Sequence, residues 1–213
     1  KESMEPEREH DFSLRPEQKK AVEITKEYFK SYKLIEKKTP HFLWNCKMRF
    51  GKTFSAYNLA KEMKWKKVLV LTFKPAVEDS WKDDLLTHKD FKNWQFIQGK
   101  TETDKDVQER KPYVCFASFQ DFLGKSKAGG IKIKNEWAHK VNWDCIILDE
   151  YHYGAWNENS KGILSSIDEN IEKEKQEIEK EEGFSDIQKV WDESISPLKT
   201  NHYLYLSGTP FRA

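Results

Sequence analysis

Short apolar runs alternate along this chain with longer stretches in which apolar residues recur every three or four positions. The recurring positions predict amphipathic helices, and the short continuous runs indicate strands that are covered on both faces. This alternation predicts an α/β fold with a mostly parallel, doubly wound sheet and helices on both faces. The expected helices cover 16–37, 54–63 and 77–85, and the expected strands cover 41–45, 68–71, 96–97, 114–117, 141–148 and 203–206.

Three stretches fall outside this pattern. Residues 1–11 are polar, and we expect a disordered or polar lead before a domain that covers 12–213. The segment 124–134 predicts a turn or a small hairpin. Eleven acidic residues against four lysines in 168–193 predict a charged, acidic helical insertion at about 160–200. A solvated surface explains this insertion best, and a surface for a protein partner is the alternative.

Composition narrows the class of protein. With 213 residues the chain can bury one full hydrophobic core. A mean hydropathy of -0.88, with no apolar stretch near 18 residues, argues against a membrane span. Three widely spaced cysteines favour reduced thiols over a zinc site or disulfides, and no signal peptide is visible, so we expect a cytoplasmic protein. The chain starts with lysine, and we expect it to be a fragment of a longer polypeptide.

The charges are distributed unevenly along the chain. The overall net charge is +1, but the acidic stretch 168–193 carries −7, so the remainder carries about +8. A basic body is compatible with a partner that has a phosphate backbone, although it does not require one.

The strongest chemical signal follows the strand expected at 41–45. Residues 46–53 read Cys-Lys-Met-Arg-Phe-Gly-Lys-Thr, with Cys46 and Arg49 at positions where phosphate-binding loops often have glycine. In such a loop the backbone N–H groups cradle phosphates, the lysine reaches the β/γ oxygens and the threonine hydroxyl meets Mg²⁺. The start of the next helix adds its positive dipole end. The candidate nucleotide-binding residues here are Met48, Arg49, Phe50, Gly51, Lys52 and Thr53.

Two carboxylates, Asp149 and Glu150, follow the apolar run at 141–148. Alone, such a pair is also explained as an acidic strand end that caps a neighbouring helix. With a phosphate loop upstream, we expect Asp149 to hold Mg²⁺ and Glu150 to orient or deprotonate the attacking water. His152 lies two residues further on; a lone histidine is more often structural, but beside the acid pair we expect it to relay between the nucleotide and the segment that follows. The candidate catalytic residues are therefore Lys52, Asp149, Glu150 and His152, with Thr53 and Asp149 as metal ligands.

Taken together, these segments resemble superfamily 2 helicases and translocases of the DExH type. The resemblance is strongest to the group that contains type III restriction enzyme Res subunits and type I restriction motor subunits. Residues 14–18, Leu-Arg-Pro-Glu-Gln, are similar to the leading motif, which implies nucleotide binding by Arg15 and Gln18, with Gln18 recognising adenine. Residues 46–53 and 149–152 are similar to the first and second motifs. The resemblance implies a RecA-like P-loop NTPase domain.

Three further segments, 73–75, 117–120 and 206–212, are similar to the remaining motifs of that group. All six run in the expected order from residue 14 to residue 212. The resemblance implies nucleic-acid contacts by Lys74, Pro75, Ser118 and Gln120, and coupling of hydrolysis to strand movement by Ser207 and Thr209.

The function that the resemblance implies is that of the first motor domain of an ATP-dependent DNA helicase or translocase in a restriction or defence system. ATP and Mg²⁺ are the implied cofactors, and DNA is favoured over RNA as the partner. A second RecA-like domain, which would supply an arginine finger, is absent from this sequence, so we expect the isolated chain to be nearly inactive. A nuclease or methyltransferase would be compatible as a further partner. An RNA helicase domain and a non-catalytic nucleotide-binding module stay open as alternatives.

Overall fold

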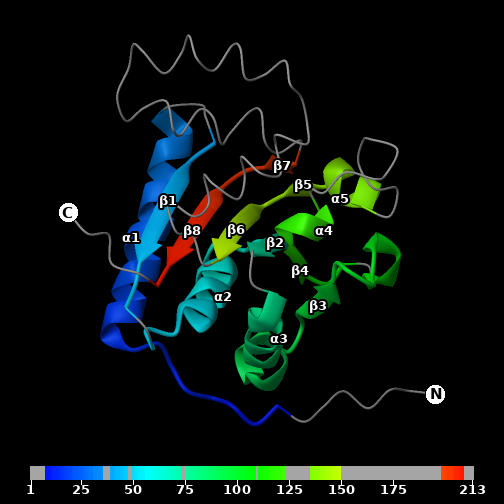
Figure 1. Ribbon diagram of the computed structural model, residues 1–213. Coiled ribbons are helices and arrows are strands. Elements are labelled where there is room, and N and C mark those ends of the chain that lie inside the picture. The colour runs from blue at the N-terminus through cyan, green and yellow to red at the C-terminus, as the bar shows by residue number, and fades with distance from the viewer. Residues whose placement is uncertain are drawn as a thin grey trace.

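A six-stranded sheet lies at the centre of the molecule (Figure 1). The computed structural model of the chain describes residues 8–35, 39–47, 49–72, 75–108, 110–122, 135–149 and 198–208. The sheet has the order β1-β8-β6-β2-β4-β3, and every pair of neighbours is parallel. Its strands are β1 (His41–Asn45), β2 (Lys67–Thr72), β3 (Gln95–Gln98), β4 (Tyr113–Ser118), β6 (Cys145–Asp149) and β8 (Tyr203–Ser207). The predicted parallel sheet is confirmed.

Helices connect these strands and cover both faces of the sheet. The α-helices are α1 (Pro16–Ile35), α2 (Lys52–Glu62), α3 (Glu78–Thr87), α4 (Phe119–Phe122) and α5 (Glu136–Lys140). In the described part of the chain there are also the short 3₁₀ helices η1 (Pro75–Val77), η2 (Lys89–Phe91) and η3 (Asp104–Asp106). In Figure 1, α2 and α3 lie near each other in the lower part of the view, and α4 and α5 lie at the right. Side chains of α2 and α3 pack in one layer of the core, and side chains of α4 and α5 pack in the other. The predicted cover of helices on both faces is confirmed.

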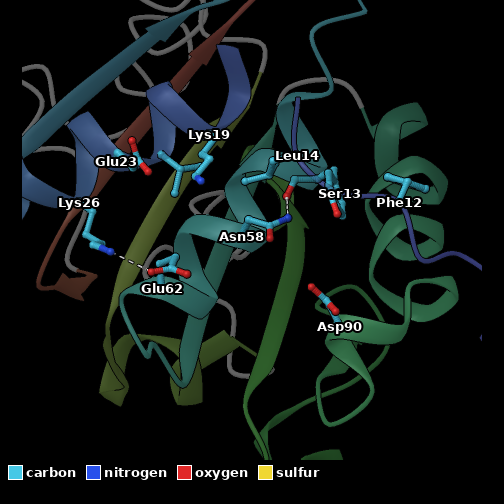
Figure 2. A pocket seen from close by; sticks show the side chains of 11 residues that line it. Phe12, Ser13, Leu14, Lys19, Glu23, Lys26, Asn58, Glu62 and Asp90 are labelled. Carbon is cyan, nitrogen blue, oxygen red and sulfur yellow. Dashed lines mark hydrogen bonds and ion pairs between the residues drawn. The ribbon is translucent and has the colours of Figure 1, made fainter. Parts of the chain in front are cut away.

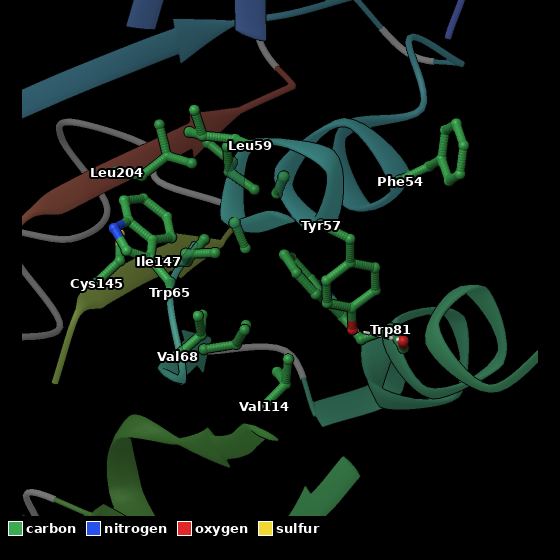
Figure 3. Close-up of a cluster of buried hydrophobic side chains, with 14 of the residues drawn as sticks. Phe54, Tyr57, Leu59, Trp65, Val68, Trp81, Val114, Cys145, Ile147 and Leu204 are labelled. Atoms are coloured by element: carbon green, nitrogen blue, oxygen red, sulfur yellow. Dashed lines mark hydrogen bonds between the residues drawn. The ribbon is translucent and has the colours of Figure 1, made fainter. Parts of the chain in front are cut away.

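Alternation along the central strand β2 divides the core into two layers. Val68 and Val70 pack with α1, α2 and α3 on one face, whereas Leu69 and Leu71 pack with α4 and α5 on the other. Both sets are almost completely buried, as expected for a parallel strand. Figure 3 shows the first layer, where Leu59 of α2 and Trp81 of α3 meet the strands.

The strand ends are aligned by the register of the sheet. Thr72, the last residue of β2, is in register with Asp149 of β6 on one side and Ser118 of β4 on the other. Asn45, the last residue of β1, is in register with Ser207 of β8. Because all strands are parallel, these polar residues lie along one edge, where α/β sheets bind their ligands.

The prediction of a single strand over residues 141–148 is wrong. The structure divides it into β5 (Asn142–Trp143), which pairs with β7 (Lys199–Thr200), and β6 of the main sheet. Asp144 separates the two because its carboxylate accepts hydrogen bonds from the backbone N–H groups of Lys66 and Lys67, at 2.7 and 3.0 Å.

The end of the polar lead is attached to the domain. The Arg8 guanidinium donates to the carbonyls of Leu85 and His88, at 2.6 and 3.0 Å. His10 forms a parallel β-bridge with His88. Residues 8–11 therefore contact the end of α3, within the segment for which the sequence predicts a disordered or polar lead.

Some expectations lie outside the described residues. These are the hairpin at 124–134 and almost all of the acidic insertion at 160–200. The three cysteines are free, and burial raises the pKa of the Cys115 and Cys145 thiols, so these two stay protonated. Within the described part of the chain, no helix is long and apolar enough to cross a membrane.

A matched pair of leucines tests the core. We expect Leu204→Ala to lower the free energy of unfolding by about 2–5 kcal/mol, because Leu204 is fully buried in β8 and truncation leaves a cavity. Leu43→Ala makes the same change on the edge strand β1, where Leu43 is 40% exposed, and we expect it to cost less than about 1 kcal/mol. Urea unfolding followed by circular dichroism measures both. Equal losses would contradict this arrangement of the core.

Candidate nucleotide-binding site

The phosphate-loop candidate connects β1 to α2. The loop turns with a hydrogen bond from the Phe50 N–H to the Lys47 carbonyl, at 3.2 Å. Two of its residues adopt left-handed backbone, Arg49 with φ 65° and Gly51 with φ 79°. Gly51 is the N-cap of α2, and since glycine has no side chain, it leaves the first N–H groups of the helix without a side-chain cap. A helix start of this kind binds anions.

Side chains at the start of α1 hold this loop by its carbonyl groups. Arg15 donates to the carbonyls of Phe50 and Arg49, at 2.7 and 3.1 Å, and Gln18 Nε2 donates to the Phe50 carbonyl at 2.7 Å. Gln18 Oε1 in turn accepts from the Arg15 N–H at 2.8 Å. Both ends of the Gln18 amide thus join the start of α1 to the loop. Arg15 and Gln18, both predicted to bind the nucleotide, therefore shape the phosphate loop.

Gly51 is required here for two physical reasons. Its φ of 79° is unfavourable for residues with a Cβ atom. A Cβ atom at this position would also lie 2.5 Å from Gln18 Nε2, which is closer than real contacts allow. The tight approach of α1 to the loop thus depends on glycine.

The loop also contacts the end of β8. The Cys46 N–H donates to the Ser207 carbonyl at 3.0 Å, and Ser207 is 1% exposed. On the other side of the loop, Lys52 Nζ lies close to Gly208, 3.2 Å from the place where a Cβ atom would be. The predicted phosphate lysine and the predicted coupling segment are therefore neighbours in space. Thr209 of that segment lies outside the described residues.

Asp149 ends β6 at the same edge of the sheet and is 5% exposed. Its Oδ2 accepts a hydrogen bond from Trp81 Nε1 of α3 at 2.7 Å. A buried carboxylate needs such a partner, since burial without hydrogen bonds is costly. This contact of Trp81 is not evident from the sequence, because it joins residues 68 positions apart. Glu150 and His152, the other two acid-motif candidates, lie outside the described residues, as does Met48 of the loop.

The predicted nucleic-acid residues follow the next two strands of the sheet. Pro75 begins η1 after β2 and is exposed, while Ser118 ends β4 and is 7% exposed. Gln120 lies in α4, but its side chain is outside the described part, and Lys74 is outside it altogether. Pro75, after β2, and Ser118, at the end of β4, thus lie at the carboxyl edge on the strands that follow β6 in the order of the sheet.

A pocket of about 370 Å³ lies between the N-terminal segment, α1, α2 and η2 (Figure 2). Phe12, Leu14 and Phe54 supply apolar surface, and Phe12 is itself 49% exposed. None of the predicted site residues lines this pocket. In the sequence, the feature that lies nearest to this pocket is Phe12, the aromatic residue shortly before Arg15 and Gln18. The polar part of the lining consists of Ser13, Lys19, Glu23, Lys26, Asn58, Glu62 and Asp90.

The oxygen atoms at this site suit a Mg²⁺ ion that is bound together with phosphates, rather than a metal ion held by protein side chains alone. Within the described residues, no group of three or more histidine, cysteine or acidic side chains is placed to hold a metal. Mg²⁺ is typically bound by one or two protein oxygens together with substrate phosphates and water. Asp149, with the Thr53 hydroxyl at the start of α2, provides oxygens of this kind. These residues fit a magnesium–nucleotide complex.

Comparison with known proteins identifies the family. A family model described as type III restriction enzyme, res subunit, matches residues 11–212. The chain belongs to this family. It is also 33% identical, over 217 aligned residues, to the putative type II restriction enzyme and methyltransferase RM.MpnORF110P C-terminus of Mycoplasma pneumoniae. That alignment covers 94% of this chain and 29% of the relative, so this chain spans less than a third of that protein.

Two solved structures share the fold. The Sulfolobus solfataricus SWI2/SNF2 ATPase core in complex with double-stranded DNA superposes with a TM-score of 0.53 at 17% identity, covering 97% of this chain and 34% of that one. A nuclease-deletion mutant of the type ISP restriction-modification enzyme LlaGI, in complex with a DNA substrate mimic, superposes with a TM-score of 0.52 at 15% identity. The match covers 95% of this chain and 18% of that one. The predicted superfamily 2 resemblance and the RecA-like ATPase fold are confirmed. The roles of individual residues stay predictions.

A double-mutant cycle tests the contact between α1 and the loop. We expect Gly51→Ala to destabilise the protein by about 1–3 kcal/mol, through left-handed strain and collision with Gln18. In a Gln18→Ala background the collision disappears, so the loss should shrink by at least about 0.5 kcal/mol. Urea unfolding of the four proteins gives the coupling. Strictly additive losses would contradict the contact.

Proposed function

We propose that this chain is the ATP-binding first motor domain of a DNA helicase or translocase that belongs to a restriction or defence system. The observation that carries the proposal is the convergence of three segments at one sheet edge. The phosphate loop, the Asp149 strand end and the Ser207 strand end come together there, joined by the Cys46–Ser207 hydrogen bond of 3.0 Å. The family contains a superfamily 2 ATPase domain, which agrees with this arrangement.

In this proposal the start of α2 binds the triphosphate. The uncapped N–H groups after Gly51 receive phosphate oxygens, and Lys52 supplies positive charge to the β/γ oxygens. Thr53 and Asp149 hold Mg²⁺, which when bound neutralises charge that develops on the phosphates. Glu150 orients or deprotonates the attacking water. Arg15 and Gln18 keep the loop in shape and offer their remaining hydrogen-bonding positions to the base.

The order of the strands supports separate positions for the nucleotide and the nucleic acid along this edge of the sheet. β1, β8 and β6 bring the phosphate loop and Asp149 to one half, while β2 and β4 lead to Pro75 and Ser118 at the other half. Thr72 lies between them, in register with both Asp149 and Ser118. Nucleic acid gripped by its backbone at the second half would leave the first half to the nucleotide. Backbone contacts carry no sequence information, which suits a motor that moves along DNA.

The comparisons favour DNA over RNA as the substrate. The SWI2/SNF2 core and the LlaGI enzyme are both described in complexes with DNA or a DNA mimic, and the Mycoplasma relative is named as a restriction enzyme and methyltransferase. These descriptions support a restriction role, with a nuclease or methyltransferase as a partner. An RNA helicase domain and a non-catalytic nucleotide-binding module are the alternatives that the experiments below separate.

Two substitutions in the full-length protein test the motor assignment. We expect Lys52→Ala to weaken ATP binding and to lower DNA-stimulated turnover on the order of 100-fold, since removal of one charge-stabilising donor has that effect. Glu150→Gln should lose turnover but still bind ATP. The matched control is Lys61→Ala, an exposed lysine on the same helix that is ion-paired to Asp90, and it should leave turnover unchanged. Turnover is measured by phosphate release with double-stranded DNA and with RNA.

The results of that assay separate the alternatives. Strong stimulation by RNA and none by DNA would replace the restriction assignment with an RNA helicase. ATP binding without turnover on any nucleic acid would favour the non-catalytic module.

The isolated chain provides a separate prediction about the second motor domain. We expect residues 1–213 to bind ATP weakly and to hydrolyse it slowly, because the arginine finger of the second domain is the part that stabilises charge in the transition state. Adding the second domain in trans, or measuring the full-length protein, should restore turnover. Brisk, saturable hydrolysis by the isolated chain would show that this half is sufficient.

A further inference from the structure

Trp81 is a buried tryptophan of α3 that makes its polar contact at the predicted metal site. Its indole N–H donates to Asp149 Oδ2 at 2.7 Å, and the side chain is 1% exposed. The residue lies 68 positions before Asp149 in sequence. We propose that Trp81 is a positioning residue, which orients the Asp149 carboxylate for Mg²⁺ when nucleotide binds. This inference rests on the function proposed above.

The chemistry of the indole suits that role. A carboxylate has several acceptor positions, so the bond from Trp81 to Oδ2 is compatible with a cation at the same carboxylate. The terminal torsion of aspartate is broad, and a hydrogen bond to one oxygen restricts it. The indole is a neutral donor, so it orients the carboxylate and leaves its negative charge for the metal. Groups that hold metal ligands in this way typically change affinity or activity by about 10–100-fold.

Tyr57 fixes the tryptophan from the other side. Its hydroxyl donates to the Trp81 carbonyl at 2.6 Å, and its ring meets the indole edge-on, with centroids 5.4 Å apart and planes at 88°. Figure 3 shows this contact in the core. Both side chains are 1% exposed, so neither position is easily changed without moving α2 or α3.

These contacts form a buried chain between the two halves of the phosphate site. Tyr57 lies on α2, the helix that begins with Lys52 and Thr53, and Trp81 connects it to Asp149 of β6. This series of buried contacts fixes α2 relative to the Asp149 carboxylate through α3. The same helix α3 begins directly after η1, which contains Pro75 of the predicted nucleic-acid segment.

The matched control is Trp44, a second buried tryptophan of the same core layer. It is 3% exposed and donates from Nε1 to Thr25 Oγ1 at 2.7 Å, so Trp44→Phe removes an equivalent hydrogen bond away from Asp149. Trp81→Phe keeps an aromatic ring and removes only the donor and part of the ring. The two variants separate a loss of core stability from a loss of metal positioning.

The experiment measures how strongly Mg²⁺ improves ATP binding. A fluorescent ATP analogue is titrated into the full-length protein in Mg²⁺ and in EDTA, and thermal unfolding is recorded for each variant. We expect Trp81→Phe to reduce the gain in affinity from Mg²⁺ by about 10-fold, with little change in EDTA. Its ATP turnover should need correspondingly more Mg²⁺ to saturate. Trp44→Phe should lower the unfolding temperature without changing either Mg²⁺ response.

The outcomes distinguish the two proposals. If Trp81→Phe matches the wild type in its Mg²⁺ response, or if Trp44→Phe shows the same loss, the positioning role is overturned while the motor assignment stands. If the wild type itself shows no Mg²⁺-dependent ATP binding, both are overturned.

A measurement on the unmutated protein covers the case in which Trp81→Phe does not fold. Selective ¹⁵N labelling of tryptophan allows the indole N–H signals to be followed. Adding Mg²⁺ to the ATP-bound protein should shift the Trp81 indole signal and leave that of Trp44 in place. An unchanged Trp81 signal would overturn the proposal.

Discussion

The parallel register of β2 with its two neighbours is the constraint on which the rest of the molecule depends. It brings the last residues of β6, β2 and β4, namely Asp149, Thr72 and Ser118, into one row. A shift of one residue in β2 would turn Val68 and Val70 away from α2 and α3 and place Leu69 and Leu71 there instead. The hydrophobic packing on both faces therefore fixes the place at which the polar strand ends meet.

This arrangement concentrates buried polar groups at the functional edge. Thr72, Ser118, Asp149 and Ser207 are all at most 7% exposed. Buried polar groups are stable only when they are hydrogen-bonded, so the edge has to recruit partners from the surrounding elements. For Asp149 that partner comes from α3, through Trp81. The need to satisfy the carboxylate thus connects a helix of the outer layer to the centre of the predicted chemistry.

The sequence predicted most of this framework because local patterns encode it. Continuous apolar runs revealed the strands of the main sheet, and the glycine and lysine at 51–52 revealed the loop at a strand–helix junction. The role of Trp81 was not predictable in the same way. Helical spacing with Val77 and Leu85 shows only that its side chain faces inward, whereas its hydrogen bond joins positions 68 residues apart.

Two other differences have similar causes. The strand break at Asp144 depends on backbone N–H groups of Lys66 and Lys67, which become neighbours only after the sheet forms. The order at Arg8 depends on carbonyls at the end of α3, which the polar composition of residues 1–11 does not reveal. Both are long-range contacts of side chains with backbone, and no periodic pattern records them.

The loop geometry shows why the beginning of α1 is part of the site. A left-handed backbone at Arg49, a residue with a Cβ atom, costs on the order of 1 kcal/mol. Hydrogen bonds from Arg15 and Gln18 to the carbonyls of Arg49 and Phe50 offset that cost. These bonds hold the loop in its curved shape. A binding site that is already ordered loses less conformational entropy when phosphate enters it, so these two side chains contribute to affinity through the shape of the loop.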